Sequence, residues 1–297
     1  MKLNKFKFKT YLYIVTAMIC WSFSFIWTQT ALESFQPITL ITLRLILASI
    51  FLYIFAKLTR KFKRLEKQDL KIFLLLAFFE PFLYYVGETY GLTLVEPTLA
   101  SVIVSTIPVF APVFAFTFLR EKISLLNFIG IAFSIFGVYL VVYQQNGSSA
   151  TDIKGILLLL LAVFSAICYS IILRKIPEKY SATNIVMYQS MLSLIYFIPT
   201  FLLVDFSAPV HGEISFASVK ALLLLTIFAS VMAFVLFADS VRVIGVARAQ
   251  IFVNLIPVFT AIFSWILLRE QLNLIQWLGI AVVIAGLFIS QRRKAKV

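Results

Sequence analysis

The sequence predicts an all-α integral membrane protein whose ten transmembrane helices form two inverted repeats of five helices. Three observations favour this fold class. Hydrophobic residues make up 62% of the chain and charged residues only 13%, which leaves too little polar sequence to cover large soluble cores. Apolar runs of transmembrane length recur almost back to back along the chain. Part of the sequence also returns at a fixed offset.

The apolar runs are expected to be helices. A membrane-spanning segment must satisfy its own backbone hydrogen bonds, and the runs lack the alternation that is typical of a β-barrel. The ten runs cover residues 11–29, 37–57, 71–94, 97–119, 125–143, 155–174, 182–204, 217–241, 246–268 and 273–290. The expected domains are a first repeat over 11–143 and a second over 155–290, with basic tails over 1–10 and 291–297.

The repeat is clearest in the fourth and fifth runs of each half. Residues 107–140 match residues 256–289 at 14 of 34 positions when shifted by 149. A repeat with five spans has an odd number of crossings, so the second copy must enter the membrane from the opposite side. Inverted repeats give a central site two related ways of opening, which is the architecture of alternating-access transporters.

The basic residues are sorted between the loops. With a cytoplasmic N-terminus, 22 of the 26 Lys and Arg residues fall in segments on the cytoplasmic side. The positive-inside rule therefore predicts a multi-pass protein of the cell membrane with both termini in the cytoplasm. The net charge of +13 is explained by orientation and by attraction to anionic membrane lipids, so no nucleic-acid partner is expected.

The fourth and ninth runs are the candidate solute pathway. Each has two polar side chains on the same helical face as a proline, at matching places in the repeat. Proline leaves backbone carbonyls free, which is tolerated at membrane depth only beside protein or a water-filled cavity. A packing kink is the alternative for either proline alone. The polar residues are Ser101, Ser105, Gln250 and Asn254, and the helix breaks are Pro108 and Pro257.

Aromatic and hydroxyl side chains share a face in the first run, at Trp21 and Ser24, and Tyr169 has a similar setting in the sixth run. A pocket lined in this way suits amphipathic solutes such as amino acids, nucleoside-like compounds or organic cations. The alternative, in which these rings contact lipid or neighbouring helices, stays open.

Two ionisable residues lie at similar depth in the second and third runs. Arg44 and Glu88 each stand six or seven residues from the outer end of their run, a depth of roughly 10 Å. Charges in hydrocarbon are costly unless they are paired or hydrated. We expect these two side chains to form an intramembrane ion pair.

Glu80 lies near the middle of the third run, where no basic residue stands at matching depth. Loss of hydration favours the neutral form of such a carboxyl group and would let it exchange a proton. It shares a helical face with Tyr84, which is a candidate solute contact, and Pro81 follows it directly. Glu80 is the predicted proton-coupling or cation-recognising group. The alternative is a protonated glutamic acid that ties two helices together.

Residues of conventional catalytic chemistry are sparse. The single histidine, His211, is in an expected loop, and Cys20 and Cys168 belong to separate runs. We therefore expect no catalytic site, no metal site and no cofactor. The alternative function is a membrane-embedded enzyme that uses the carboxylates of the third run.

Small residues form a stripe of the kind that allows close helix packing in the fifth and tenth runs. They are Gly130, Ser134 and Gly137 in the fifth run and Gly279, Ala281, Ala285 and Gly286 in the tenth. The sequence leaves open whether these runs pair within one chain or between two copies. Both a monomer and a homodimer are therefore compatible with it.

Several short stretches together resemble the EamA-type members of the drug/metabolite transporter superfamily. They include 21–25, 43–48, 100–110, 119–121, 188–189, 245–249 and 254–257. The resemblance implies ten helices in two inverted EamA domains and the export or exchange of small metabolites, with a multidrug or organic-cation exporter as the alternative. Ser22, where the family often has glycine, and the acidic third run depart from the family pattern.

Overall fold

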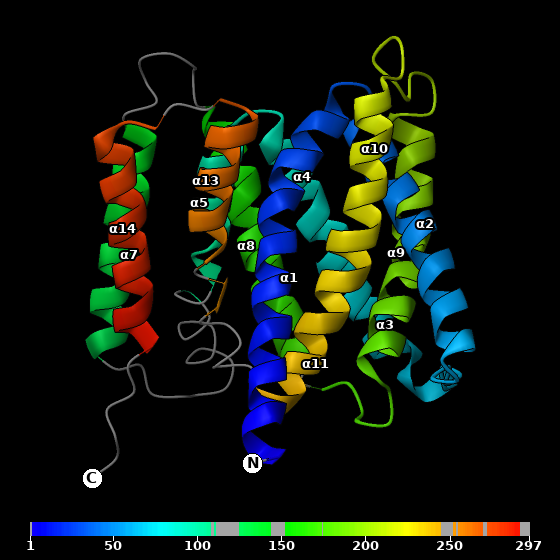
Figure 1. Ribbon diagram of the computed structural model, residues 1–297. Helices are drawn as coiled ribbons and strands as arrows, with labels where there is room; N and C mark the ends of the chain where they lie inside the picture. The colour runs from blue at the N-terminus through cyan, green and yellow to red at the C-terminus, as the bar shows by residue number, and fades with distance from the viewer. Residues whose placement is uncertain are drawn as a thin grey trace.

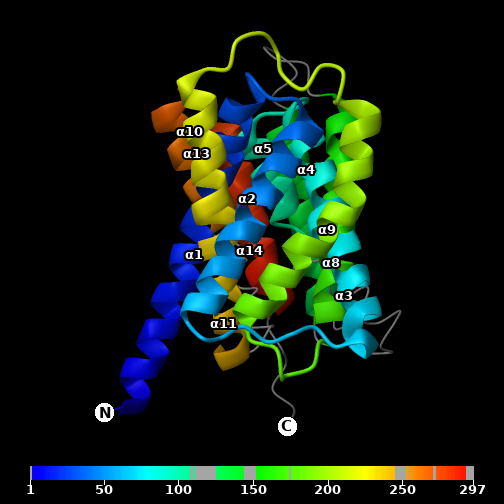
Figure 2. The ribbon, with the colours of Figure 1, turned by 90° about the vertical axis from the view of Figure 1, so that its right-hand side faces the viewer.

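The computed structural model describes residues 2–107, 110, 125–143, 152–173, 175–244, 252–253, 255–269 and 272–291. Nearly all of these residues are helical, and the helices stand side by side in one bundle (Figure 1). The first residues of α1 and the last residues of α14 lie at the same end of this bundle (Figures 1 and 2).

The helices of the first repeat are α1 (Lys2–Leu32), α2 (Pro37–Leu58), η1 (Lys67–Asp69), α3 (Leu70–Ala77), η2 (Phe78–Leu83), α4 (Tyr84–Leu92), α5 (Pro97–Val104) and α7 (Leu125–Tyr143). Those of the second repeat are α8 (Ile153–Leu173), α9 (Ala182–Val204), α10 (Phe216–Leu224), η4 (Leu225–Ala233), α11 (Phe234–Ile244), α13 (Ile256–Leu267) and α14 (Leu274–Gln291).

Among the residues that the structure describes, six helical segments are long and apolar enough to cross a membrane: Lys9–Leu32, Pro37–Leu58, Lys67–Leu92, Ile153–Leu173, Ala182–Val204 and Phe216–Ser240. They correspond to the first three expected spans of each repeat. Helices α5, α7, α13 and α14 lie in the other four expected spans. The total of ten spans stays a prediction.

The third helix of each repeat contains a π-helical segment, η2 in the first repeat and η4 in the second. In η2 the backbone of Glu80 leaves the helical region, with φ −142° and ψ 117°, immediately before Pro81. Proline lacks the amide hydrogen that a continuous helix would use, and π-helical insertions are frequent at functional sites. The backbone is therefore interrupted beside the carboxylate of Glu80.

The first helix of each repeat packs on the other repeat. Helix α1 contacts α10, η4, α11 and α13, whereas α8 contacts α3, η2, α4 and α5. The second helices, α2 and α9, contact each other. Residues from both repeats therefore surround the centre of the bundle.

Helices α2 and α9 run antiparallel. Asp205, just after α9, accepts hydrogen bonds from the amide and the hydroxyl of Thr39 in the first turn of α2, at 2.7 and 3.0 Å. At the opposite end, Asn184 in the first turn of α9 donates to the carbonyl of Lys61, just after α2, at 2.7 Å. Equivalent helices that run in opposite directions are what an inverted repeat requires.

Helices α7 and α14 pack on each other within the chain (Figure 1). A Cβ atom at Gly137 would come within 2.7 Å of the carbonyl oxygen of Gly279 and of the amide nitrogen of Val283. Only a glycine allows this approach of the two backbones. The packing predicted for the fifth and tenth runs is therefore made inside one chain.

Candidate functional site

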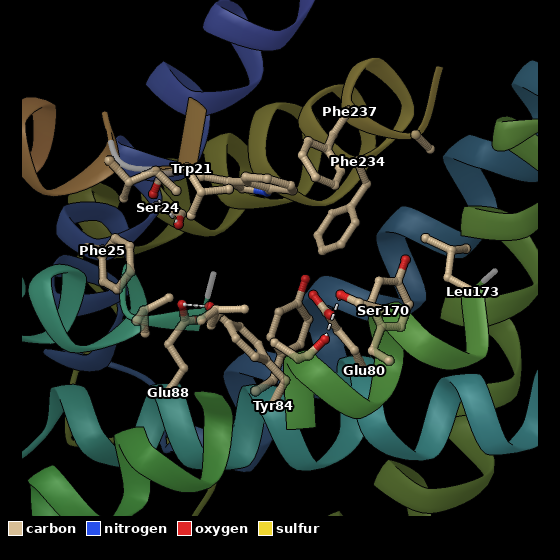
Figure 3. Close-up of a pocket in the computed structure, with 18 of the residues that line it drawn as sticks. Trp21, Ser24, Phe25, Glu80, Tyr84, Glu88, Ser170, Leu173, Phe234 and Phe237 are labelled. Carbon is tan, nitrogen blue, oxygen red and sulfur yellow. Dashed lines mark hydrogen bonds between the residues drawn. The ribbon is translucent and has the colours of Figure 1, made fainter. Parts of the chain in front are cut away.

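A cavity of about 90 Å³ lies between the helices of the two repeats (Figure 3). This volume has room for several water molecules or a small solute. The lining includes residues of α1 (Trp21, Ser24), α2 (Arg44), η2 (Glu80), α4 (Tyr84, Tyr85, Glu88), α8 (Tyr169) and α11 (Phe234, Phe237). Both repeats contribute to the wall.

Two carboxylates line this cavity on one side (Figure 3). Glu80 is 7% exposed and Glu88 is 5% exposed. Glu88 accepts a hydrogen bond from the hydroxyl of Tyr84 at 3.0 Å. The carboxylate of Glu80 has no hydrogen bond or ion pair with any residue that the structure describes. The carboxylate oxygens of Glu80 are therefore available to accept hydrogen bonds from a ligand in the cavity.

Arg44 extends from α2 to the same cavity and is 3% exposed. Its Nε donates a short hydrogen bond to the hydroxyl of Ser230 in η4. Its guanidinium carbon lies 4.4 Å from the centre of the Tyr85 ring, a cation–π contact. The side chain is therefore fixed by one residue of each repeat.

The ion pair expected between Arg44 and Glu88 is not formed. Among the residues that the structure describes, the ion pairs are those of Lys179 with Glu66 and Asp69. Arg44 and Glu88 line the same cavity, but their direct partners are Ser230 and Tyr84, respectively. Equal depth along two helices did not imply contact, because depth leaves the rotation of each helix undetermined.

Aromatic rings form the opposite side of the cavity (Figure 3). The ring of Trp21 lies 5.2 Å from that of Phe234 and 5.0 Å from that of Phe237, measured between centroids. Aromatic faces attract cations and apolar groups alike. The cavity therefore combines an acidic side with an aromatic side.

Four predicted solute contacts line the cavity: Trp21, Ser24, Tyr84 and Tyr169. The hydroxyl of Ser24 donates to the carbonyl of Trp21 at 2.7 Å, and that of Tyr169 donates to the side-chain oxygen of Gln189 at 3.1 Å. Their roles in solute binding stay predictions.

The other predicted contacts divide into two groups. Ser101 and Ser105 are fully buried and do not line this cavity. Their hydroxyls donate to the carbonyls of Thr98 and Val102. Pro257 is the second residue of α13, so it marks a helix start. Gln250, Asn254 and Pro108 lie outside the described residues.

Sequence reasoning missed Tyr85, Ser230, Phe234 and Phe237. The repeat could have indicated Phe237, because the offset of 149 residues aligns it with the predicted site residue Glu88. A predicted site residue of the first repeat thereby indicates the equivalent cavity position in the second repeat.

Together the fold and the cavity define a multi-pass α-helical membrane protein with a charged internal site shared by two repeats. The model of the EamA-like transporter family matches residues 8–143 and 153–291. The chain belongs to the EamA-like transporter family.

Curated relatives agree with this assignment. The uncharacterized transporter YetK of Bacillus subtilis is 28% identical over 85% of this chain and 77% of its own length. An uncharacterized transporter of Archaeoglobus fulgidus is 26% identical over 96% of this chain and 98% of its own. A protein of Escherichia coli named "Probable amino-acid metabolite efflux pump" is 26% identical over 59% of this chain and 60% of its own.

A solved crystal structure has the same fold. It superposes with a TM-score of 0.70 over 95% of this chain and 97% of its own, at 15% sequence identity. At that identity the likeness concerns the fold alone.

Proposed function

We propose that this EamA-family transporter moves amino acids or related amphipathic solutes across the cell membrane by alternating access, coupled to proton movement through Glu80. The observation that supports this most strongly is the buried cavity between the two repeats, with a carboxylate that has no partner among the described residues. Intramembrane ionisable groups commonly mark solute and proton pathways.

Alternating access follows from the proposed ten-helix arrangement. Two inverted repeats, over 11–143 and 155–290, surround one site and can open it to either side by related movements. The antiparallel contact of α2 with α9 supports this arrangement. The proposed orientation places both termini in the cytoplasm, because the basic residues gather on that side.

Proton coupling is proposed because Glu80 is costly to ionise without a counter-charge. A proton or a cationic group of the solute would each remove that cost. The two therefore compete for the same carboxylate, and movement of one is tied to movement of the other.

Transport is favoured over a membrane enzyme because the polar groups come from both repeats and surround one central cavity. An enzyme site of the alternative kind would gather its polar groups near one membrane interface. Export of amino-acid metabolites is supported by the name of the Escherichia coli relative. An organic-cation exporter is the second candidate, since two carboxylates and several aromatic rings line the cavity.

The test is transport in proteoliposomes that contain the purified chain. A panel of radiolabelled amino acids and amines is offered with and without an imposed pH gradient. We expect the gradient to drive accumulation of at least one amino acid in the wild type and not in Glu80→Gln. Glu178→Gln, which changes an exposed carboxylate, is the matched control. Equal accumulation by wild type and Glu80→Gln would refute proton coupling through Glu80.

A further inference from the structure

Two oppositely charged side chains on the cavity wall have unused capacity to bind a ligand. Arg44 and Glu80 are both more than nine-tenths buried, and both line the cavity. No ion pair joins either of them to any residue that the structure describes. Glu88 is the acidic group whose charge interacts with Arg44, but the two form no ion pair, and the charged neighbour of Glu80 is Glu88, which has the same sign. A ligand group of opposite charge that hydrogen-bonds to either side chain would therefore be strongly favoured.

The contacts of Arg44 hold its side chain while leaving its outer edge available. Nε donates to Ser230, and the guanidinium lies on the face of Tyr85. The two terminal nitrogens donate to no described residue. A guanidinium held in this way presents parallel N–H groups, the geometry that binds a carboxylate through two hydrogen bonds.

Glu80 is the complementary acid. Glu88 already accepts the Tyr84 hydroxyl, whereas the oxygens of Glu80 accept from no described residue. The aromatic side formed by Trp21, Phe234 and Phe237 faces these carboxylates across the cavity (Figure 3). An ammonium group at Glu80 would meet a negative charge and would lie within an aromatic enclosure.

We propose that Arg44 and Glu80 are the two halves of one binding site for a zwitterionic α-amino acid. Arg44 binds the α-carboxylate and Glu80 binds the α-ammonium. Ser230 and Tyr85 are positioning residues for the guanidinium. This inference rests on the proposed transport function and narrows its solute class.

The site discriminates against amines that lack a carboxylate. Such a cation satisfies Glu80 but leaves the terminal nitrogens of the buried Arg44 guanidinium without a hydrogen-bonded counter-charge. Sites built to pair a charged group of the ligand reject analogues that lack it, because their own buried group is then unpaired. The carboxylate is thereby a requirement for tight binding.

The first experiment compares each amino acid with the amine formed by its decarboxylation, which has the same side chain. The pairs are phenylalanine with phenethylamine, leucine with isoamylamine, and arginine with agmatine. Each compound is tested as a transported solute and as a competitor in proteoliposomes of the wild type. We expect the best amino acid to be preferred over its amine by roughly ten- to a hundredfold, the range for a charge-assisted hydrogen bond.

The second experiment removes the proposed carboxylate contact. Arg44→Gln is expected to lower the apparent affinity for the amino acid by a similar factor and to change that for the amine less than about twofold. Arg64→Gln, at an exposed arginine, is the control. Ser230→Ala keeps the charge of Arg44 but removes its hydrogen-bond acceptor. It is expected to weaken amino-acid binding several-fold with the amine unchanged, and it tests the site even if Arg44→Gln does not fold.

The outcomes separate this inference from the function on which it rests. Transport of amino acids and amines with equal affinity overturns the inference and leaves proton-coupled transport standing. An equal loss of both solutes in Ser230→Ala also overturns it, since that would indicate a structural role for the Arg44 contact. Failure of the wild type to transport any compound of the panel overturns the proposed function and the inference together.

Discussion

The third helix of the first repeat and the third helix of the second share a shape but differ in chemistry. Each is divided by a π-helical segment, η2 or η4, and each packs on the first helix of the other repeat. In the first repeat this helix has Glu80, Tyr84 and Glu88. At the same offset the second repeat has alanine, alanine and phenylalanine, at 229, 233 and 237.

This difference shows that the repeat determines the architecture while divergence between its copies determines the site. The first copy supplies the acidic side of the cavity, and the second supplies Phe234 and Phe237 on the aromatic side. A symmetric pair of acidic helices would add a third carboxylate to the cavity wall, at 237, and would bury a fourth at 229, and like charges at that range repel. The asymmetry limits the carboxylates on the cavity wall to Glu80 and Glu88.

The largest effect, on stability, is expected when a carboxyl group is introduced into the third helix of the second repeat. Ala229, which aligns with Glu80, is fully buried and does not line the cavity. Ala229→Glu therefore buries a carboxyl group without a partner, and we expect destabilisation by about 3–5 kcal/mol. The midpoint of thermal unfolding in detergent measures this effect, with Ala229→Ser as the control. If Ala229→Glu unfolds at the same temperature as the wild type, the second repeat tolerates a carboxyl group at this position as well as the first does. That result would contradict the proposed difference between the two third helices.

A smaller effect is expected from the hydroxyl of Tyr84, whose equivalent in the second repeat is an alanine. Tyr84→Phe removes the hydrogen bond to Glu88 and leaves the ring in place. Tyr84 is a predicted solute contact on the cavity wall, and a hydrogen bond between its hydroxyl and a charged group of the solute would contribute about 1.5–3 kcal/mol, so solute affinity should fall at least several-fold. Competition binding measures this change, with Tyr11→Phe at an exposed tyrosine as the control. Unchanged affinity would remove Tyr84 from the binding site.

The smallest effect on stability is expected at the N-terminal ends of the third helices of the two repeats. Lys179 pairs with Glu66 and Asp69 beside η1, at 2.6 and 2.7 Å, whereas α10 begins with the neutral cap Ser215. The hydrogen bond from Lys179 lowers the pKa of Glu66. A lowered pKa in the folded state adds stability above the unfolded pKa, and this stability is lost as the pH falls through the folded value.

Lys179→Gln should therefore lower the unfolding midpoint slightly at neutral pH, because exposed ion pairs contribute little. The difference from wild type should disappear in acid, once both Glu66 and Asp69 are protonated. Ser215→Ala removes the neutral cap of α10 and is expected to cost about the same at every pH. A Lys179→Gln difference that persists in acid would show that the ion pair is not its source.

The positions of the charged cavity residues could be anticipated from the sequence. Arg44, Glu80 and Glu88 interrupt apolar runs, and such residues are costly unless they face a cavity or a partner. All three line the cavity. Trp21 and Tyr169 were indicated by polar neighbours at helical spacing, and they line it too.

Direct contacts could not be anticipated in the same way. A serine in a helix can donate to a carbonyl three residues earlier, so the spacing of Ser101 and Ser105 did not show that they faced a cavity. The partner of Arg44 depended on the rotation of α2 against η4, for which the sequence has no periodic signal. The chain has 31 phenylalanines, and hydrophobicity alone did not distinguish Phe234 and Phe237 from the others.

The most direct test of the central claim is proton movement driven by the solute alone. Proteoliposomes with an entrapped pH-sensitive dye receive a gradient of a transported amino acid and no pH gradient. We predict that the wild type changes the internal pH as the solute moves and that Glu80→Gln, folded to the same extent, does not. Equal pH changes in both would contradict the assignment of proton coupling to Glu80.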